Sequence, residues 1–221
     1  MNEFGSFAKL FDEQVLYLTL LHLHTPETSL ALKTVKEAVG ISPDLKAEIS
    51  RLFGESNWRP HLVAASALGF TKPTTAVITP AWNAFDQGSW VCPQLAAVLS
   101  LYDKSFKQQA IKRLIMACLD TNRVRQEATI QQTGHPSLPH FVFKIPPIHS
   151  DPDADSSVSP ALSSKGISAL TGLLADSSDP EIKILLNRPE TLAVVAADSD
   201  HGDQIATKWR TTFKRLVQDV G

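Results

Sequence analysis

The sequence predicts an all-α protein built as an α-solenoid-like stack of antiparallel helix pairs. Three observations support this fold class. Apolar residues recur at helical spacing in one segment after another along the 221 residues. Short turns rich in Pro, Gly, Ser and Asp separate these segments. A central stretch of the chain also repeats itself at a fixed offset, which is typical of stacked helical units.

The composition indicates a globular protein without a strong electrostatic field. Apolar residues make up 43% of the chain, which is enough for a sizeable core and excludes disorder throughout. The chain has 21 basic and 23 acidic residues and a net charge of −2. Because phosphate-rich partners are attracted by a positive field, this balance disfavours nucleic acid as a partner.

The sequence predicts a cytoplasmic protein with no membrane partner. The residues after Met1 lack the basic region of a secretory signal, and the apolar run at 15–23 is shorter than the roughly 20 residues that cross a bilayer. Cys92 and Cys118 each lie among apolar residues, as expected of small core side chains. Unpaired cysteines of this kind fit a reducing compartment.

The first third of the chain predicts three helices. Asp12 precedes a buried helix at 15–23, and Pro26 ends it. A second helix starts at Thr28 or Ser29 and continues to residue 39, with Gly40 at the left-handed position that often follows a helix. Ser42, Pro43 and Asp44 then open a third helix at 45–53, which Gly54 ends.

The strongest pattern is an internal repeat between residues 56 and 120. Residues 57–70 align without gaps with residues 89–102, an offset of 32 residues. Each copy has a small polar residue that can cap a helix, then a Trp and a Pro, and then two adjacent alanines. Small residues allow a neighbouring helix to approach closely, so each copy predicts the first helix of a stacked pair.

A second helix completes each pair. In the first unit it covers residues 79–85 and ends at Asp86, Gln87 and Gly88. In the second unit it covers residues 104–119 and is amphipathic. We expect Phe106, Ala110, Ile111, Leu114, Ile115, Ala117 and Cys118 to face inward, and Lys104, Lys107, Gln108, Lys112 and Arg113 to face outward.

These residues resemble a known family of repeats. Asn57, Trp58 and Arg59, followed by the alanine-rich run at 62–69, are similar to the first helix of the short HEAT-like repeats named after phycobilin lyases. The resemblance covers about two units, or a third of the chain. It implies a curved helical array, and because about three units are usually needed for stability, the flanking helices would act as caps.

The character of the chain changes after Asp120. Residues 140–145 alternate in polarity, and we expect an extended segment there that packs on the helices. Residues 148–164 are rich in Ser, Asp and Pro and predict a flexible acidic linker, one long disordered loop. The expected domains are therefore a helical array at 1–147, this linker, and C-terminal helices at 165–221 packed on the same array. Those helices are expected at 164–175, 180–187, 189–197 and 203–219.

The candidate binding site consists of Trp58, Arg59, Trp82, Asp86 and Trp90. These residues place three of the four tryptophans near successive helix starts and turns. One interpretation is that the tryptophans pack neighbouring repeats against each other. The other is that they line a concave face, because aromatic residues and Arg dominate binding surfaces.

The sequence predicts no metal, cofactor or catalytic residue. His22 and His24 are two residues apart, so on a helix they would point in nearly opposite directions and could not share a metal ion. Asp151, Asp153 and Asp155 begin like a calcium loop, but Ser156 and Leu162 occupy the positions that need Gly and Glu. No phosphate-binding loop or nucleophile motif is present in the sequence.

We therefore expect a non-catalytic interaction module that binds another protein through a concave helical face. The alternative is an enzyme, a HEAT-like DNA glycosylase acting on damaged DNA. The resemblance would then imply that Trp58, Trp82 and Trp90 contact the lesion and that Asp86 stabilises a sugar cation. Such an enzyme needs a basic groove, which the net charge of −2 disfavours.

Overall fold

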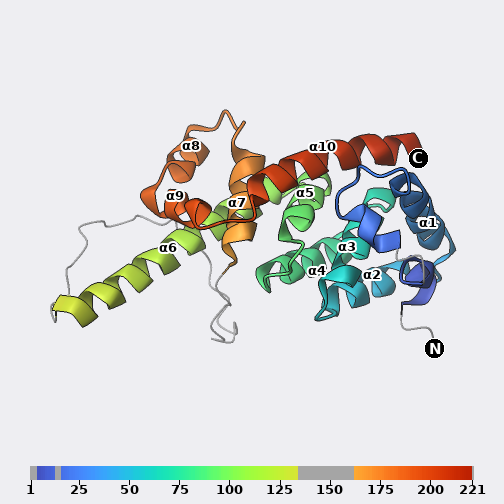
Figure 1. Ribbon diagram of the computed structural model, residues 1–221, viewed down its shortest axis with the longest axis horizontal. Helices are drawn as coiled ribbons and strands as arrows, with labels where there is room; N and C mark the ends of the chain where they lie inside the picture. The colour runs from blue at the N-terminus through green and yellow to red at the C-terminus, as the bar shows by residue number, and fades with distance from the viewer. Residues whose placement is uncertain (1–3, 13–15, 134–161, 221) are drawn as a thin grey trace.

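The computed structural model describes residues 4–12, 16–133 and 162–220, with the backbone alone for 122–133. All regular structure in these ranges is helical, which confirms the predicted all-α class (Figure 1). No helix among them is both long and apolar enough to span a bilayer. The α-helices are α1 (Thr28–Ile41), α2 (Leu45–Gly54), α3 (Trp58–Ala67), α4 (Thr75–Asp86), α5 (Cys92–Tyr102), α6 (Phe106–Thr133), α7 (Ser164–Leu174), α8 (Pro180–Leu186), α9 (Pro189–Ala196) and α10 (Gly202–Val220).

The helix predicted at 15–23 is wrong in type and length. The chain forms one short 3₁₀-helix there, η2 (Leu16–Leu20), and Leu23 has a positive φ of 57°. A separate 3₁₀-helix, η1 (Gly5–Leu10), precedes this segment. The carbonyls of Leu20 and Leu21 accept hydrogen bonds from Trp209 and Gln94, two side chains far along the sequence. These tertiary bonds and the left-handed Leu23 mark the place where the segment leaves helical geometry.

Side-chain caps start several helices where the sequence predicts. The Asp44 carboxylate accepts a hydrogen bond from the Ala47 amide at the start of α2, and the Asn57 side chain accepts one from the Arg59 amide at the start of α3. The expected left-handed glycine after α1 is wrong, because Gly40 lies inside that helix and Ser42 follows it in extended geometry.

The two copies of the sequence repeat differ in where their helices begin. The helix predicted at 79–85 begins earlier, at Thr75, and has Pro80 inside it. The start of α5 is delayed to Cys92, so Trp90 lies in the preceding turn whereas its counterpart Trp58 is the first residue of α3. Pro93 sits in the first turn of α5, where its missing N–H costs nothing, and this favours the later start.

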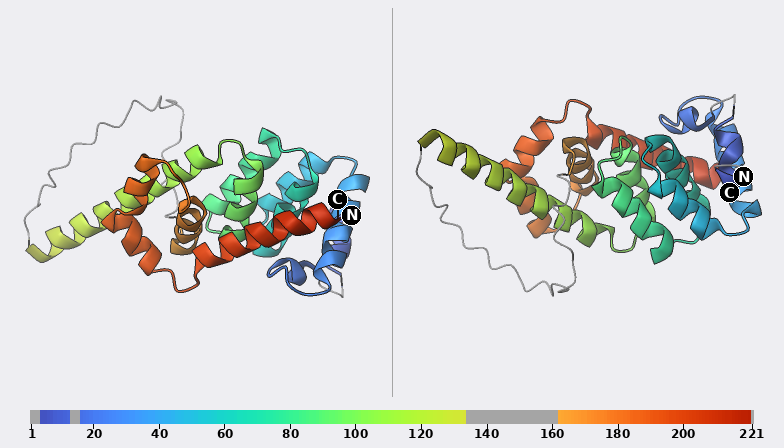
Figure 2. Two further views of the ribbon diagram at one scale, coloured as in Figure 1. Left: turned by 90° about the horizontal axis from the view of Figure 1, so that it is seen from above. Right: turned by 90° about the horizontal axis from the view of Figure 1, so that it is seen from below.

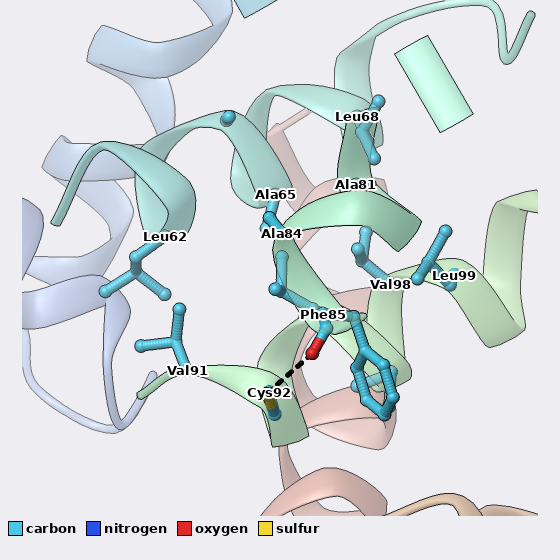
Figure 3. Close-up of a cluster of buried hydrophobic side chains, with 14 of the residues drawn as sticks. Leu62, Ala65, Leu68, Ala81, Ala84, Phe85, Val91, Cys92, Val98 and Leu99 are labelled. Carbon is cyan, nitrogen blue, oxygen red and sulfur yellow. Dashed lines mark hydrogen bonds between the residues drawn. The ribbon is translucent and has the colours of Figure 1, made fainter. Parts of the chain in front are cut away.

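The core forms where α3, α4 and α5 meet. Residues 60–67 of α3 and 92–99 of α5 are buried on every side. Figure 3 shows Leu62 from α3, Phe85 from α4 and Cys92 from α5 gathered in this cluster. The Cys92 thiol donates a hydrogen bond to the Phe85 carbonyl at 3.5 Å. Close helix approach depends on the small residues predicted to permit it, since the paired alanines of both copies are fully buried.

The helices contact one another in a regular order. α1 contacts α3, α3 contacts α5, and α5 contacts α7, while α2 packs against both α3 and α4. The last helix, α10, lies lengthwise over this series and touches α7, α5 and α1 (Figures 1 and 2). Its apolar side carries Trp209 and Phe213, both buried, with ring centroids 4.3 Å apart.

Helix α6 departs from the prediction in length and in orientation. It continues to Thr133, beyond the end expected at residue 119, and projects from the body of the molecule (Figure 2). Arg113 was expected to face outward but is 8% exposed, whereas Ile115 was expected to face inward and is 40% exposed. The extended segment predicted at 140–145, the first part of the linker at 148–161 and the acidic residues of the calcium-like loop lie outside the described residues.

Candidate functional site

A pocket of about 600 Å³ opens beside the start of α3 and the turn between α4 and α5. Trp58 and Arg59 border it from the first turn of α3, and Trp90 borders it from the α4–α5 turn. Three of the five residues predicted for the binding site therefore lie together. Gly88, in the same turn, has a φ of 75°, a left-handed conformation that brings the chain round from α4 towards Trp90.

The two pocket tryptophans form one aromatic surface. The ring centroids of Trp58 and Trp90 are 5.0 Å apart, with the planes inclined at 51°. Tyr17 supports Trp58 from behind with an edge contact at 6.2 Å. Trp58 is half-buried, but Trp90 is 50% exposed. The pair thus joins the start of α3 to the α4–α5 turn and also leaves an indole open to solvent.

Each of these indoles carries a cation from the protein itself. The guanidinium carbon of Arg59 lies 5.1 Å from the ring centroid of Trp58, and the Lys165 ammonium lies 4.5 Å from that of Trp90. Lys165, from the first turn of α7, also pairs with Asp200 at 3.2 Å. Sequence reasoning missed Lys165, because no local pattern connects it to a tryptophan 75 residues earlier.

A buried histidine supports the wall of the pocket. His61 is 4% exposed, and its Nε2 lies 2.7 Å from the backbone oxygen of Glu55. A carbonyl can only accept, so Nε2 donates, and in the neutral ring Nδ1 accepts a hydrogen bond from the Ser89 hydroxyl at 2.8 Å. Burial lowers the pKa of His61 from 6.5, although hydrogen bonding to backbone oxygens opposes the shift. These bonds hold the end of α2 and the α4–α5 turn together.

The other two predicted residues, Trp82 and Asp86, belong to a different cluster. Trp82 is 5% exposed, and its indole N–H donates to the Asp103 carboxylate at 2.8 Å. Arg113 stacks on the Trp82 ring at 3.9 Å and makes two hydrogen bonds of 2.6 Å to the two carboxylate oxygens of Asp86. Neither Trp82 nor Asp86 borders the pocket, and both are engaged by the α4–α6 contact.

Within the described ranges, no group of three or more His, Cys, Asp or Glu side chains is placed to hold a metal ion. The His22 and His24 rings lie 5.6 Å apart, in the turn after η2. Comparison with protein-family models, curated proteins and solved structures gives no match for this chain.

Proposed function

We propose that this chain is a non-catalytic interaction module that binds another protein through the Trp58–Trp90 pocket. The observation that carries the proposal is the half-exposed Trp90, held against Trp58 at the edge of a pocket of about 600 Å³. Tryptophan is highly buried on average, and it is enriched among the residues that dominate binding energy at interfaces. Arginine is enriched among such residues as well, and Arg59 borders the same pocket.

The proposed scaffold is a short HEAT-like array. The contacts of α1 with α3, α3 with α5 and α5 with α7 support it, because in such an array the first helices of successive units lie side by side. The contacts between α2 and α4 support a matching second layer. In this arrangement the pocket lies between two adjacent units, at the beginning of their first helices.

The rigidity of the pocket favours binding. Trp58 is fixed by Tyr17 and Trp90, and the turn that carries Trp90 is anchored through Ser89 and His61. Side chains that are already ordered lose little conformational entropy when a partner arrives.

The proposal includes a cytoplasmic setting, which the two free and buried cysteines support.

The experiment is an affinity capture from cell extract, followed by titration of the captured partner. The baits are the wild-type chain, Trp90→Ala and Ile184→Ala, a matched loss of an apolar side chain that is 66% exposed on α8. We expect a partner that the wild type and Ile184→Ala retain, and whose dissociation constant rises about 30-fold with Trp90→Ala, as for a residue worth about 2 kcal/mol. Trp82→Ala is unsuitable as a test, since it would disturb the α4–α6 contact.

A DNA-binding titration tests the glycosylase hypothesis. The same three proteins are titrated with a duplex containing an alkylated base at low and at moderate salt. Salt-dependent binding that Trp90→Ala abolishes would overturn the protein-binding proposal in favour of the enzyme. Retention of the same protein partners by wild type and Trp90→Ala would also contradict the proposal, because the pocket would then play no part in binding.

A further inference from the structure

Four basic side chains lie on the outer side of α10. All four are exposed: Lys208, Arg210, Lys214 and Arg215. We refer to them as the basic face. Trp209 and Phe213, on the inner side of the same helix, are buried. Figures 1 and 2 show no other described helix over the outer side of α10, so the basic face is open to solvent.

The acidic side chains of α10 do not neutralise the basic face. Within the described residues none of its four cations forms an ion pair. Between Gln204 and Gln218 the helix contains no Asp or Glu. Its two acids, Asp203 and Asp219, lie near its ends. The middle of α10 therefore carries an excess of positive charge.

The elements packed against α10 add little negative charge. α5, η2 and η3 carry no charged residue. α7 carries Lys165, which is paired with Asp200 in the turn before α10. In the same turn, Asp198 accepts a hydrogen bond from the Gly202 amide. α1 carries two cations and one acid: Lys33, Lys36 and Glu37.

We propose that the basic face of α10 binds the sugar–phosphate backbone of double-stranded nucleic acid. Its four cations pair with phosphates, and the exposed Gln204 and Thr207 on the same side supply further hydrogen-bond donors. The inference goes beyond the proposed function and does not depend on it, because no residue of the basic face borders the Trp58–Trp90 pocket.

The density of charge favours a duplex over a protein partner. The basic face covers residues 208–215, which is about 10 Å along the axis at about 1.5 Å per residue. A duplex carries one charge per roughly 1.7 Å of its axis, so a stretch of that length contains about six phosphates. A protein would need an unbroken run of acidic side chains to offer the same density.

Two other polyanions match the basic face less well. Single-stranded nucleic acid is held largely by bases that stack on aromatic side chains, and both aromatic residues of α10 are buried. A peripheral helix is held on a membrane by apolar side chains that enter it, and α10 exposes no large apolar residue.

The net charge of −2 does not oppose this local field. At about 0.1 M salt, charges more than about 10 Å apart are largely screened from each other. Acidic residues elsewhere on the protein thus contribute little potential at the basic face. Clustering of Lys and Arg along one helix is the pattern of a phosphate-binding surface.

The test is fluorescence anisotropy of a labelled DNA duplex of random sequence, titrated with the full chain between about 25 and 200 mM salt. We expect the binding constant to fall with a logarithmic salt slope of about −3 to −4, because each of four neutralised phosphates contributes about 0.9. Trp90→Ala should show the same affinity and slope, since the pocket is not involved.

The double variant Arg210→Gln/Lys214→Gln removes half of the basic face and keeps good helix-forming residues at both positions. We expect it to bind about 10- to 30-fold more weakly at the lowest salt, with a slope less steep by about two. Lys46→Gln/Lys183→Gln makes the same change of net charge at exposed residues of α2 and α8. This control should change binding less than about twofold, and circular dichroism checks that each variant is folded.

Equal weakening by the two double variants would overturn the inference, because net charge and not α10 would then control binding. Absence of binding at the lowest salt would overturn it as well. Tighter binding of polyglutamate than of a duplex of equal charge would assign the basic face to an acidic protein, and tighter binding of phosphatidylserine vesicles would assign it to a membrane. None of these results bears on the Trp58–Trp90 pocket, which the affinity capture tests separately.

Discussion

Arg113 is a buried cation whose charge is balanced by Asp86 and whose flat face covers Trp82. A helical wheel of α6 assigns this residue to the outer side, because the pattern of one helix cannot show a carboxylate 27 residues away on α4. The opposite error at Ile115 has the same origin. The position of a charged side chain on a helix thus depends on partners that the helix itself does not contain.

Replacing Asp86 by Asn should lower the free energy of unfolding by about 1–3 kcal/mol. The substitution leaves the Arg113 guanidinium buried without its counter-charge, and the cost stays below that of a fully buried pair because the Asp86 side chain is 39% exposed. Urea unfolding measures the change. Lys107→Gln serves as the control, since the Lys107–Asp179 pair is exposed and should contribute much less to the free energy of unfolding. Equal losses in the two variants would contradict the structural role of Arg113.

His61 should make the protein less stable as the pH falls below about 6.5. Its pKa is lowered in the folded state, so the unfolded chain binds more protons between the two pKa values, and the free energy of unfolding declines over that range. The Lys107 hydrogen bond lowers the pKa of Asp179 from 3.8. Protonation of that carboxylate therefore changes the free energy of unfolding only at more acidic pH.

Unfolding free energies of wild type and His61→Gln at several pH values from 7.5 to 5.5 test this expectation. The variant should be less stable throughout, because it loses the bonds to Ser89 and Glu55, but its stability should depend less on pH. Parallel curves for the two proteins would show that His61 does not cause the decline.

Between elements, a Gly→Ala substitution should have opposite effects on stability at two positions, Gly69 and Gly40. A Cβ at Gly69, in η3 (Leu68–Phe70), would lie 2.8 Å from the Phe213 ring and 2.9 Å from a Val217 methyl group of α10. Gly69→Ala should therefore push α10 away and cost about 1–3 kcal/mol. Gly40 lies inside α1 with open space around it, so Gly40→Ala should stabilise the protein by up to about 1 kcal/mol.

Thermal or urea unfolding of the two variants measures both effects. The difference in sign is the decisive result, since the change in intrinsic helix preference is similar at the two positions. A stabilised Gly69→Ala protein would mean that α10 does not pack tightly on η3.

Element boundaries were predictable where local chemistry decides them. Asp44 and Asn57 cap helices as expected, and the prolines at 180 and 189 open α8 and α9. The segment at 16–23 was not predictable, because two of the hydrogen bonds that its carbonyls accept come from α5 and α10. Part of the site could be found from the sequence repeat, since Trp58 and Trp90 occupy equal positions in its two copies and their rings are in contact. Lys165 could not, because it reaches the pocket from a helix outside the repeat.

For the whole molecule, α10 makes the helices depend on one another. In a simple repeat array each unit touches only its neighbours, so the ends can unfold separately. Here α10 contacts α7, α5 and α1, and the Trp209 indole donates to the Leu20 carbonyl at 3.0 Å. We therefore expect wild-type unfolding to be a single transition.

Trp209→Ala tests this coupling. The substitution should cost about 3–5 kcal/mol, because it removes a buried aromatic side chain. It should also separate the urea transition seen by circular dichroism from the one seen by the fluorescence of Trp58, Trp82 and Trp90. Trp90→Ala, which leaves α10 intact, should keep the two transitions coincident. Coincident transitions in Trp209→Ala would mean that other contacts suffice to couple the helices.

The bond between Trp209 and Leu20 also has a consequence for biosynthesis. Its partners are 189 residues apart, so at about 5–20 residues per second the ribosome needs roughly 10–40 seconds after Leu20 to deliver Trp209. During that time the side of α1 that α10 later covers is open to other nascent chains and to chaperones, and so is the corresponding side of α5 once α5 has been made. Slower translation of residues 162–202 would lengthen this exposure without altering the stability of the finished protein.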